Sequence, residues 1–181
     1  MSLRNRLIAL GAVGFLATAG SFLGPAESGP KGPQLTPYSD IGGVRTWCYG
    51  ETAGTPKSRY TVADCDAELI RSIQKHWDGI KHVVPESAPE SVKAGMLSVA
   101  YNVGVSGFLW EYDAKGRRVP SRFIKPLAGE DWEAACGAIT ALWQGKHGIA
   151  LGYKATVKGR PVRGLENRRK AEVALCRQDL R

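Results

Sequence analysis

The chain has 181 residues, of which 43% are hydrophobic and 23% charged, and its net charge is +8. This composition is typical of one soluble globular domain with a sizeable core. The sequence is not of low complexity, and it contains no internal repeat. Arg4 and Arg6 precede the globular part, which therefore carries about +6. Such a charge favours a polyanionic partner, such as nucleic acid, anionic lipid or acidic cell wall, or it is simply a soluble basic surface.

An uncharged apolar segment of 18 residues, Leu7 to Gly24, follows the two arginines. It predicts either a cleaved secretory signal, with Ala17-Thr18-Ala19 before the cleavage site, or a membrane helix near the minimum spanning length. Arg4 and Arg6 then stay cytoplasmic, and the rest of the chain is exported. Because four residues of the segment are glycine and four are alanine, a membrane helix made of it would be held only weakly in lipid.

The globular part is predicted to begin with a small β-hairpin lobe, because residues 27–57 are rich in Gly, Pro, Thr and Tyr. Alternation over residues 44–49 predicts a short strand after the Gly42-Gly43 turn. Helices should follow, the first capped by Thr61 with Asp64 three positions later. We expect helices at 61–83, 87–104, 121–127, 131–143 and 165–178, a loop at 107–120, and a loop or hairpin at 145–164. The predicted fold class is α+β, mostly helical.

The four cysteines, Cys48, Cys65, Cys136 and Cys176, fit neither a zinc pattern nor a CxxC redox pair. An even number behind an export segment predicts two disulfides in an oxidising compartment. We favour Cys48–Cys65 and Cys136–Cys176 because each closes a short or moderate loop, although the sequence is compatible with three pairings.

The segment from Pro37 to Thr52 contains the most informative motif: Asp40 precedes Thr46 by six positions, and Gly50-Glu51-Thr52 follows as a turn. It resembles the active-site hairpin of the phage-lysozyme family, glycoside hydrolase family 24. Two later segments resemble the same family, Ser98–Gly104 its central helix and Gly164–Glu172 its C-terminal Gly-Leu-x-Asn-Arg-Arg helix. The resemblance covers residues 27–177, and the weakly held N-terminal segment resembles the signal-arrest-release segments of certain phage endolysins.

The resemblance implies a lysozyme-like fold and a peptidoglycan-degrading endolysin for host cell lysis, which cuts the β-1,4 bond between N-acetylmuramic acid and N-acetylglucosamine. Glycoside cleavage needs one carboxylic acid to protonate the leaving oxygen and one carboxylate to activate water. The resemblance assigns Asp40 to the water and Thr46 to holding it, in an inverting mechanism with carboxyls roughly 6.5–9.5 Å apart. Such chemistry needs no cofactor. The competing interpretations are an Asx-turn residue for Asp40 and an ordinary strand residue for Thr46.

The general acid departs from the family spacing, in which a Glu at the end of a helix precedes the Asp by about nine positions. Lys31 occupies that position here, and Glu27, thirteen positions before Asp40, is the only acidic residue upstream. An insertion of four residues within Ser28–Pro33 would reconcile Glu27 with the pattern, although Pro25 should disturb a helix ending there. We expect Glu27 to be the general acid rather than a solvated charge in a linker. Glu51 is the second candidate for this role.

Other side chains are assigned to the sugar-binding cleft or to the core. Tyr38, Tyr49, Tyr101 and Asn102 are expected to contact the substrate, with packing and helix capping as the alternative for the last two. Arg168 and Arg169 should form structural ion pairs with core acids, with binding of peptide carboxylates as the alternative. His76, His82 and His147 have no metal-binding spacing.

These inferences divide the chain into an N-terminal signal-arrest-release or signal segment, residues 1–24, and a catalytic domain, residues 25–181. We expect a monomer that is tethered to the inner membrane through residues 7–24 and then periplasmic. After release, part of the segment would fold against the domain and supply the helix before Glu27. Two other functions remain: a non-catalytic peptidoglycan-binding relative, and a basic exported protein that binds nucleic acid or lipopolysaccharide. The second is disfavoured, because the sequence lacks the aromatic and basic interleaving of a nucleic-acid module.

Overall fold

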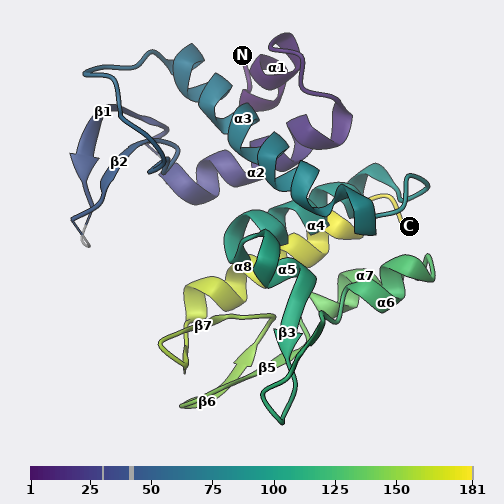
Figure 1. The fold of residues 1–181 in the computed structure, drawn as a ribbon. Helices are drawn as coiled ribbons and strands as arrows, with labels where there is room; N and C mark the ends of the chain where they lie inside the picture. Colours follow the sequence, from purple (N-terminus) through teal and green to yellow (C-terminus); the bar gives the residue numbers. More distant parts are fainter. Residues whose placement is uncertain (30, 41–42, 181) are drawn as a thin grey trace. The chain divides into compact units, whose positions relative to one another are not determined.

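The computed structural model describes residues 1–29, 31–40 and 43–180, and it groups the chain into two compact units, Met1–Lys75 and His76–Arg181 (Figure 1). Eight α-helices and four antiparallel strand pairs lie in the described residues. The mostly helical α+β class expected from the sequence is therefore confirmed. Gly42 of the predicted turn and Pro30 of the predicted insertion lie outside the described residues.

The apolar N-terminal segment forms two helices rather than one, α1 (Leu3–Ala9) and α2 (Gly14–Ser28). Gly11, with φ of +91°, lies in the turn that separates them. Pro25 lies inside α2, and the helix continues to Ser28, so the expectation that this proline disturbs the helix before Glu27 is wrong. Only the last turn of α2 follows Pro25. The Pro25 carbonyl accepts a hydrogen bond from Gly29 N at 2.9 Å. No helix among the described residues is long and apolar enough to cross a membrane.

Glycines let α1 lie directly on α2. A Cβ at Gly20 would collide with Leu7, and one at Gly24 would collide with Leu3. Gly20 also faces Ile73 of α3 (Val62–Ile80), so α2 lies between α1 and α3 in the first unit. The same glycines that would weaken a membrane helix therefore allow close packing in the folded protein.

Strands β1 (Gln34–Ser39) and β2 (Arg45–Cys48) form the predicted hairpin, with Tyr38 opposite Thr46. The register is irregular between Gln34 and Tyr38, in the part of the strand that contains a proline, which cannot donate to the ladder. The disulfide Cys48–Cys65 ties the end of β2 to the start of α3.

Helix α3 begins with the predicted capping box. The Thr61 hydroxyl accepts from Asp64 N at 3.1 Å, and the Asp64 carboxylate accepts from Thr61 N at 2.8 Å. These bonds satisfy two backbone donors that a helix start otherwise leaves unpaired. The helix ends at Ile80 and continues as a 3-10 turn, Lys81–Val83.

In the second unit, α4 (Glu90–Val103) and α8 (Arg163–Cys176) lie side by side, as Figure 1 shows. Three shorter helices complete its helical part: α5 (Val105–Leu109), α6 (Ile124–Ala128) and α7 (Trp132–Ala138). The second disulfide, Cys136–Cys176, joins α7 to α8. Both disulfides are those favoured from the loop lengths.

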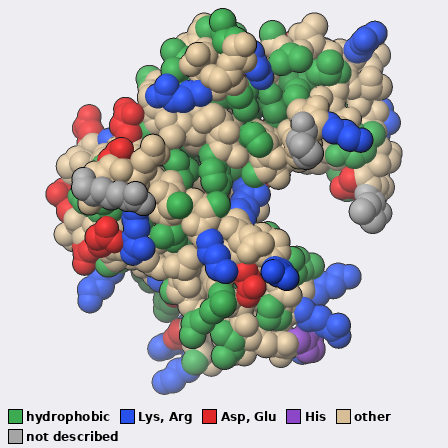
Figure 2. Space-filling view, turned by 180° about the vertical axis from the view of Figure 1, so that it is seen from behind, with side chains coloured by type: hydrophobic (Ala, Val, Ile, Leu, Met, Phe, Trp, Pro, Cys, Tyr) green, Lys and Arg blue, Asp and Glu red, His purple; other side chains and the backbone are tan. Residues whose placement is uncertain are grey.

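Three hairpins, β3–β4, β5–β6 and β7–β8, lie at one end of the second unit, in the lower part of Figures 1 and 2. Their strands are Trp110–Tyr112 with Arg118–Pro120, Leu142–Gly145 with Gly148–Leu151, and Thr156–Val157 with Arg160–Pro161. The hairpin expected within residues 145–164 is thus present.

Two predicted elements were wrong in this unit. Residues 107–120 were expected to form a loop, but they contain the end of α5 and the β3–β4 hairpin. The helix predicted to reach Trp143 ends at Ala138. Its apolar spacing continues beyond that point, but Trp143 pairs with Ala150 in the β5–β6 hairpin, and its ring packs on Tyr153 at 5.0 Å. A tertiary contact thus overrides the local helical pattern.

The crossing of α4 and α8 yields the first prediction. A Cβ at Gly95 would lie 2.6 Å from Cys176 Cβ and 3.0 Å from its Cα. Gly95→Ala should lower the free energy of unfolding by about 1–3 kcal/mol through overpacking, although alanine favours a helix by about 1 kcal/mol. Gly164→Ala in α8, where nothing lies within 4 Å, is the control and should keep or raise stability. Chemical denaturation measures both, and equal stability gains would contradict the packing argument.

Candidate active site

Asp40 lies at the tip of the β1–β2 hairpin, with its side chain exposed to solvent. Its carboxylate Oδ1 accepts from Val44 N at 2.8 Å, and its own N–H donates to the Val44 carbonyl at 2.9 Å. Gly43, with φ of +79°, donates its N–H to the Asp40 carbonyl at 2.9 Å. Asp40 therefore forms a local side-chain turn, and this turn fixes the direction of the carboxyl group at the hairpin tip.

Thr46 lies next to Asp40 because both bond to the same group. The Thr46 hydroxyl donates to the Val44 carbonyl at 3.1 Å, which also accepts from Asp40 N. Thr46 is buried, with 5% of its surface exposed. The spacing of six positions thus spans the hairpin turn and brings the two side chains to one end of the strands.

Glu27 lies in the last turn of α2 and is exposed. It faces the turn after β2: a Cβ at Gly50 would lie 3.9 Å from both Glu27 Cβ and Glu27 Oε2. Glu51, the second candidate for the general acid, lies in that turn and bridges to Trp47. The structure thus places Glu27 beside the turn that follows β2, the strand that carries Thr46.

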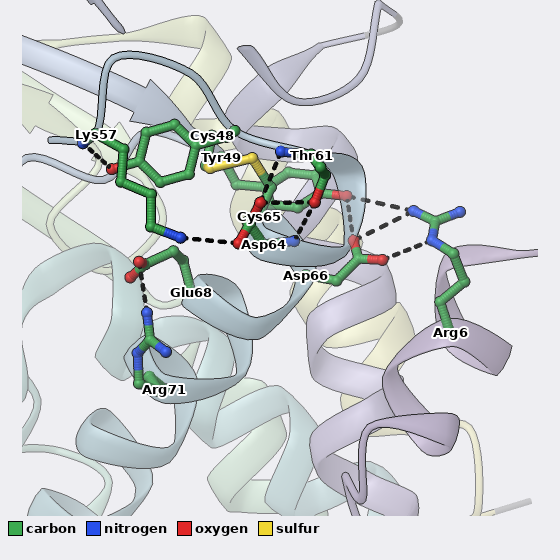
Figure 3. Close-up of a disulfide and its surroundings, with 11 residues drawn as sticks. Arg6, Cys48, Tyr49, Lys57, Thr61, Asp64, Cys65, Asp66, Glu68 and Arg71 are labelled. Atoms are coloured by element: carbon green, nitrogen blue, oxygen red, sulfur yellow. Dashed lines mark hydrogen bonds and ion pairs between the residues drawn. A yellow bond between two sulfur atoms is a disulfide. The ribbon is translucent and has the colours of Figure 1, made fainter. Parts of the chain in front are cut away.

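Tyr49 is buried beside this hairpin in a network of charged groups (Figure 3). Its hydroxyl donates to Asp66 Oδ1 at 2.8 Å, and Arg6 Nε donates to Asp66 Oδ2 at 2.6 Å. Burial and then the bond to Asp66 raise the pKa of Tyr49 to about 12, and the same carboxylate raises the pKa of Arg6. With 2% of its surface exposed, Tyr49 has a position that argues against the sugar contact predicted from the sequence.

The sequence interpretation missed the pairing of Arg6 with Asp66. Asp66 is only 1% exposed, and it precedes Leu69 and Ile73 on one face of α3 by three and seven positions. An acid at this spacing on an apolar helix face is a signal for a buried partner. Arg6 provides that partner from α1, so an ion pair joins α1 to α3, and the Tyr49 hydroxyl that also bonds to Asp66 links both to the segment after β2.

Tyr101 and Asn102 belong to the second unit, at the end of α4. The Tyr101 ring lies 4.8 Å from that of His76. Asn102 Oδ1 accepts from Arg169, which also donates to Glu172 and to the Tyr153 carbonyl. Because a guanidinium only donates, this bond directs the Asn102 carbonyl oxygen inward and leaves its amide N–H groups for another acceptor.

The buried core of this network confirms the structural ion pairs expected for the two C-terminal arginines. Arg169 and Glu172 are both 0% exposed, and Arg168 Nε lies 3.3 Å from Glu172 Oε1. The Ser98 hydroxyl donates to the same oxygen at 2.9 Å. Within the described residues, no group of three His, Cys, Asp or Glu side chains is placed to hold a metal ion.

Comparison with known proteins identifies the chain. The sequence model of the Phage lysozyme family matches residues 29–172. The chain belongs to this family. The matched region contains Asp40 and Thr46 but starts two residues after Glu27. A SAR-endolysin of bacteriophage PS34 is 31% identical over 144 residues, which are 73% of this chain and 86% of that protein. A SAR-endolysin of Haemophilus phage HP1 is 28% identical over 149 residues, 81% of this chain and 74% of that protein.

The phage lysozyme also resembles solved structures over its full length. The active form of the P1 phage endolysin Lyz superposes with a TM-score of 0.81 at 26% identity, covering 99% of this chain and 93% of that one. Its secreted inactive form gives a TM-score of 0.53 at 24% identity, covering 71% and 76%. The fold is therefore lysozyme-like, and the protein is a peptidoglycan-degrading glycosidase of the endolysin type.

The Tyr49 network predicts an alkaline loss of stability. Because the pKa of folded Tyr49 is raised from 10 to about 12, the unfolded chain loses this proton first as pH rises. The resulting stabilisation is complete below pH 10 and is lost as pH rises toward 12. The stability advantage of the wild type over Tyr49→Phe should shrink by about 1 kcal/mol between pH 9 and 11. Denaturation at several pH values measures it, and a constant difference would contradict the network.

Proposed function

We propose that this lysozyme cuts the β-1,4 bond between N-acetylmuramic acid and N-acetylglucosamine with Glu27 as general acid and Asp40 as the carboxylate that activates water. One observation carries the proposal. Glu27 at the end of α2 faces the Gly50 turn that follows β2, and the β1–β2 hairpin carries Asp40 and Thr46, which both bond to Val44, so the three residues of the proposed site lie in the first unit.

The hydrogen bonds of the hairpin suit water activation. The Thr46 hydroxyl proton is engaged by the Val44 carbonyl, so the Thr46 oxygen is oriented as an acceptor for a water proton. Asp40 keeps its backbone and Oδ1 in the turn while its side chain is exposed to solvent. A water bound by Asp40 and Thr46 would attack the anomeric carbon while Glu27 protonates the leaving oxygen, which inverts the configuration. These groups supply the proton donor and the base, so the proposal needs no cofactor.

We assign sugar binding to three of the side chains expected from the sequence, each on the evidence of its own unit. Tyr38 lies opposite Thr46 in the hairpin and is 44% exposed, which suits stacking on a sugar ring. Asn102 presents its amide N–H groups, because Arg169 holds the other side of the carboxamide. Such a donor fits the carbonyl of an N-acetyl group. Tyr101 is the third assigned contact, and peptidoglycan is the partner that all of them serve.

The catalytic assignment predicts that Glu27→Gln and Asp40→Asn each lower the rate of peptidoglycan hydrolysis by about 10²- to 10⁴-fold, because each removes one of the two carboxyls. Glu86→Gln and Asp78→Asn remove exposed acids of the second unit and should leave the rate unchanged. Release of reducing ends from purified sacculi measures turnover, and sedimentation with sacculi measures binding. The non-catalytic wall-binding alternative predicts a different result. The wild type would then bind sacculi but hydrolyse them at a rate near zero, and none of the variants would change that rate.

We further propose that the chain is exported, held at the inner membrane through residues 7–24 and then released into the periplasm as a monomer. The names of its relatives and the composition of the segment support this. The folded state supports it too, since α1 and α2 bury Leu7, Leu16 and Leu23 and α2 carries Glu27. While the segment stays in the bilayer, these contacts are absent and the helix before Glu27 is not in place. The tethered form should therefore be inactive.

The N-terminus of the active periplasmic protein tests this proposal. Because α1 and the first part of α2 belong to the folded unit, we expect the protein to start at Met1 or Ser2. A start at Gly20, which follows Ala17-Thr18-Ala19, would remove α1 and indicate a cleaved signal. Edman sequencing or intact-mass measurement decides between them. Hydrolysis of purified wall by the membrane-bound form at the rate of the released form would also contradict the proposal.

A further inference from the structure

Six large hydrophobic side chains of the second unit are exposed, and all of them lie on its hairpins rather than on its described helices: Trp110, Tyr112, Leu142, Ile149, Leu151 and Val157. Leu142 pairs with Leu151 across the β5–β6 hairpin, and Ile149 lies on the same face as Leu151, two positions away. The opposite face of this hairpin carries Trp143 and the buried Ala150. Three aliphatic side chains thus cover the outer face of one hairpin, each between 52% and 60% exposed.

The hairpins also carry most of the net charge of the chain. We define the hairpin surface as residues 110–120 and 142–161. It contains seven Lys or Arg and two acidic residues, a net charge of +5 out of the total of +8. Residues 134–165 contain no acidic residue at all. Lys and Arg side chains surround hydrophobic ones in the lower part of Figure 2.

Both acids of the hairpin surface are already paired. Asp113 pairs with Arg117 at 2.7 Å, and Glu111 pairs with Arg122 at 3.1 Å. Arg122 also donates to the Leu142 carbonyl at 3.1 Å, so it links β3 to β5. Glu166 of α8, the acid next to the surface, accepts from Leu151 N at 2.8 Å. Cations including Lys146, Lys158 and Arg160 therefore remain in excess around the exposed aliphatic side chains.

We propose that the hairpin surface docks on an anionic lipid bilayer. Leucine, isoleucine and valine insert favourably at the boundary of the acyl chains, tryptophan and tyrosine prefer the headgroup region, and lysine and arginine attract the anionic headgroups. Peptidoglycan explains these features less well, because a glycan is bound through hydrogen bonds and aromatic stacking rather than through exposed aliphatic side chains. Docking would keep the released enzyme at the membrane boundary of the periplasm, beside the wall it degrades.

Hydrogen exchange on the full chain shows which residues a vesicle protects. This resolution is needed because α1 and α2 are apolar and could bind lipid themselves. The probes are vesicles of 30% phosphatidylglycerol in phosphatidylethanolamine, pure phosphatidylcholine vesicles and soluble peptidoglycan fragments. We expect the anionic vesicles alone to protect amides of residues 142–151. Protection confined to residues 3–28, or protection of the hairpins by peptidoglycan fragments but not by vesicles, would overturn the proposal.

Matched variants separate the aliphatic and the cationic contributions in vesicle sedimentation. Leu142→Ser with Leu151→Ser should weaken binding to the anionic vesicles about tenfold or more, whereas Val62→Ser, at a valine 40% exposed in the first unit, should not. The double variant Lys146→Gln with Lys158→Gln should weaken binding to the anionic vesicles at least tenfold. Its control is the double variant Lys75→Gln with Lys125→Gln, which removes two exposed lysines outside the hairpin surface and should weaken this binding less. Equal effects of test and control variants would refute the docking surface. Turnover of soluble peptidoglycan fragments should stay at the wild-type rate in all four, which separates this proposal from the catalytic one.

Discussion

A buried carboxylate, that of Asp66, organises the first unit. A carboxylate removed from water is costly unless it is paired and hydrogen-bonded, and here Arg6 and the Tyr49 hydroxyl satisfy it. Arg6 belongs to α1, Tyr49 follows β2, and Asp66 lies in α3, so one charged group connects three elements. Loss of α1 from the unit would remove the cation and leave this acid with the tyrosine alone. Folding of the N-terminal helices and integrity of the hairpin lobe are thereby coupled.

The same coupling relates the N-terminal segment to Glu27, the proposed general acid. Helix α2 carries Glu27 at its end, and its position depends on close packing at Gly20 and Gly24. The residue composition that makes the segment a poor membrane helix is thus what the folded protein requires. Under the proposed tethering, one stretch of sequence serves two environments, because small residues contribute little to insertion in lipid and permit helices to approach closely in the folded state.

In the second unit, the helices and the hairpins carry different kinds of side chains. Its helices surround a buried ion pair, Arg169 with Glu172, which fixes the orientation of Asn102. Its hairpins carry the exposed hydrophobic and cationic side chains. In our proposals, the unit offers Asn102 to the sugar and its hairpin surface to lipid.

The sequence by itself determined the fold class, the hairpin that carries Asp40 and Thr46, and the capping box at Thr61, because each depends on contacts within a few residues. The loop lengths also favoured both disulfides. Tertiary structure decided the rest. The helix predicted to reach Trp143 stops at Ala138, because pairing with Ala150 and packing on Tyr153 outweigh a local helical pattern. Pro25 is accommodated in α2, and Arg6 meets Asp66 sixty positions away. No local pattern encodes such a distant partner, because burial and charge pairing are properties of the folded chain.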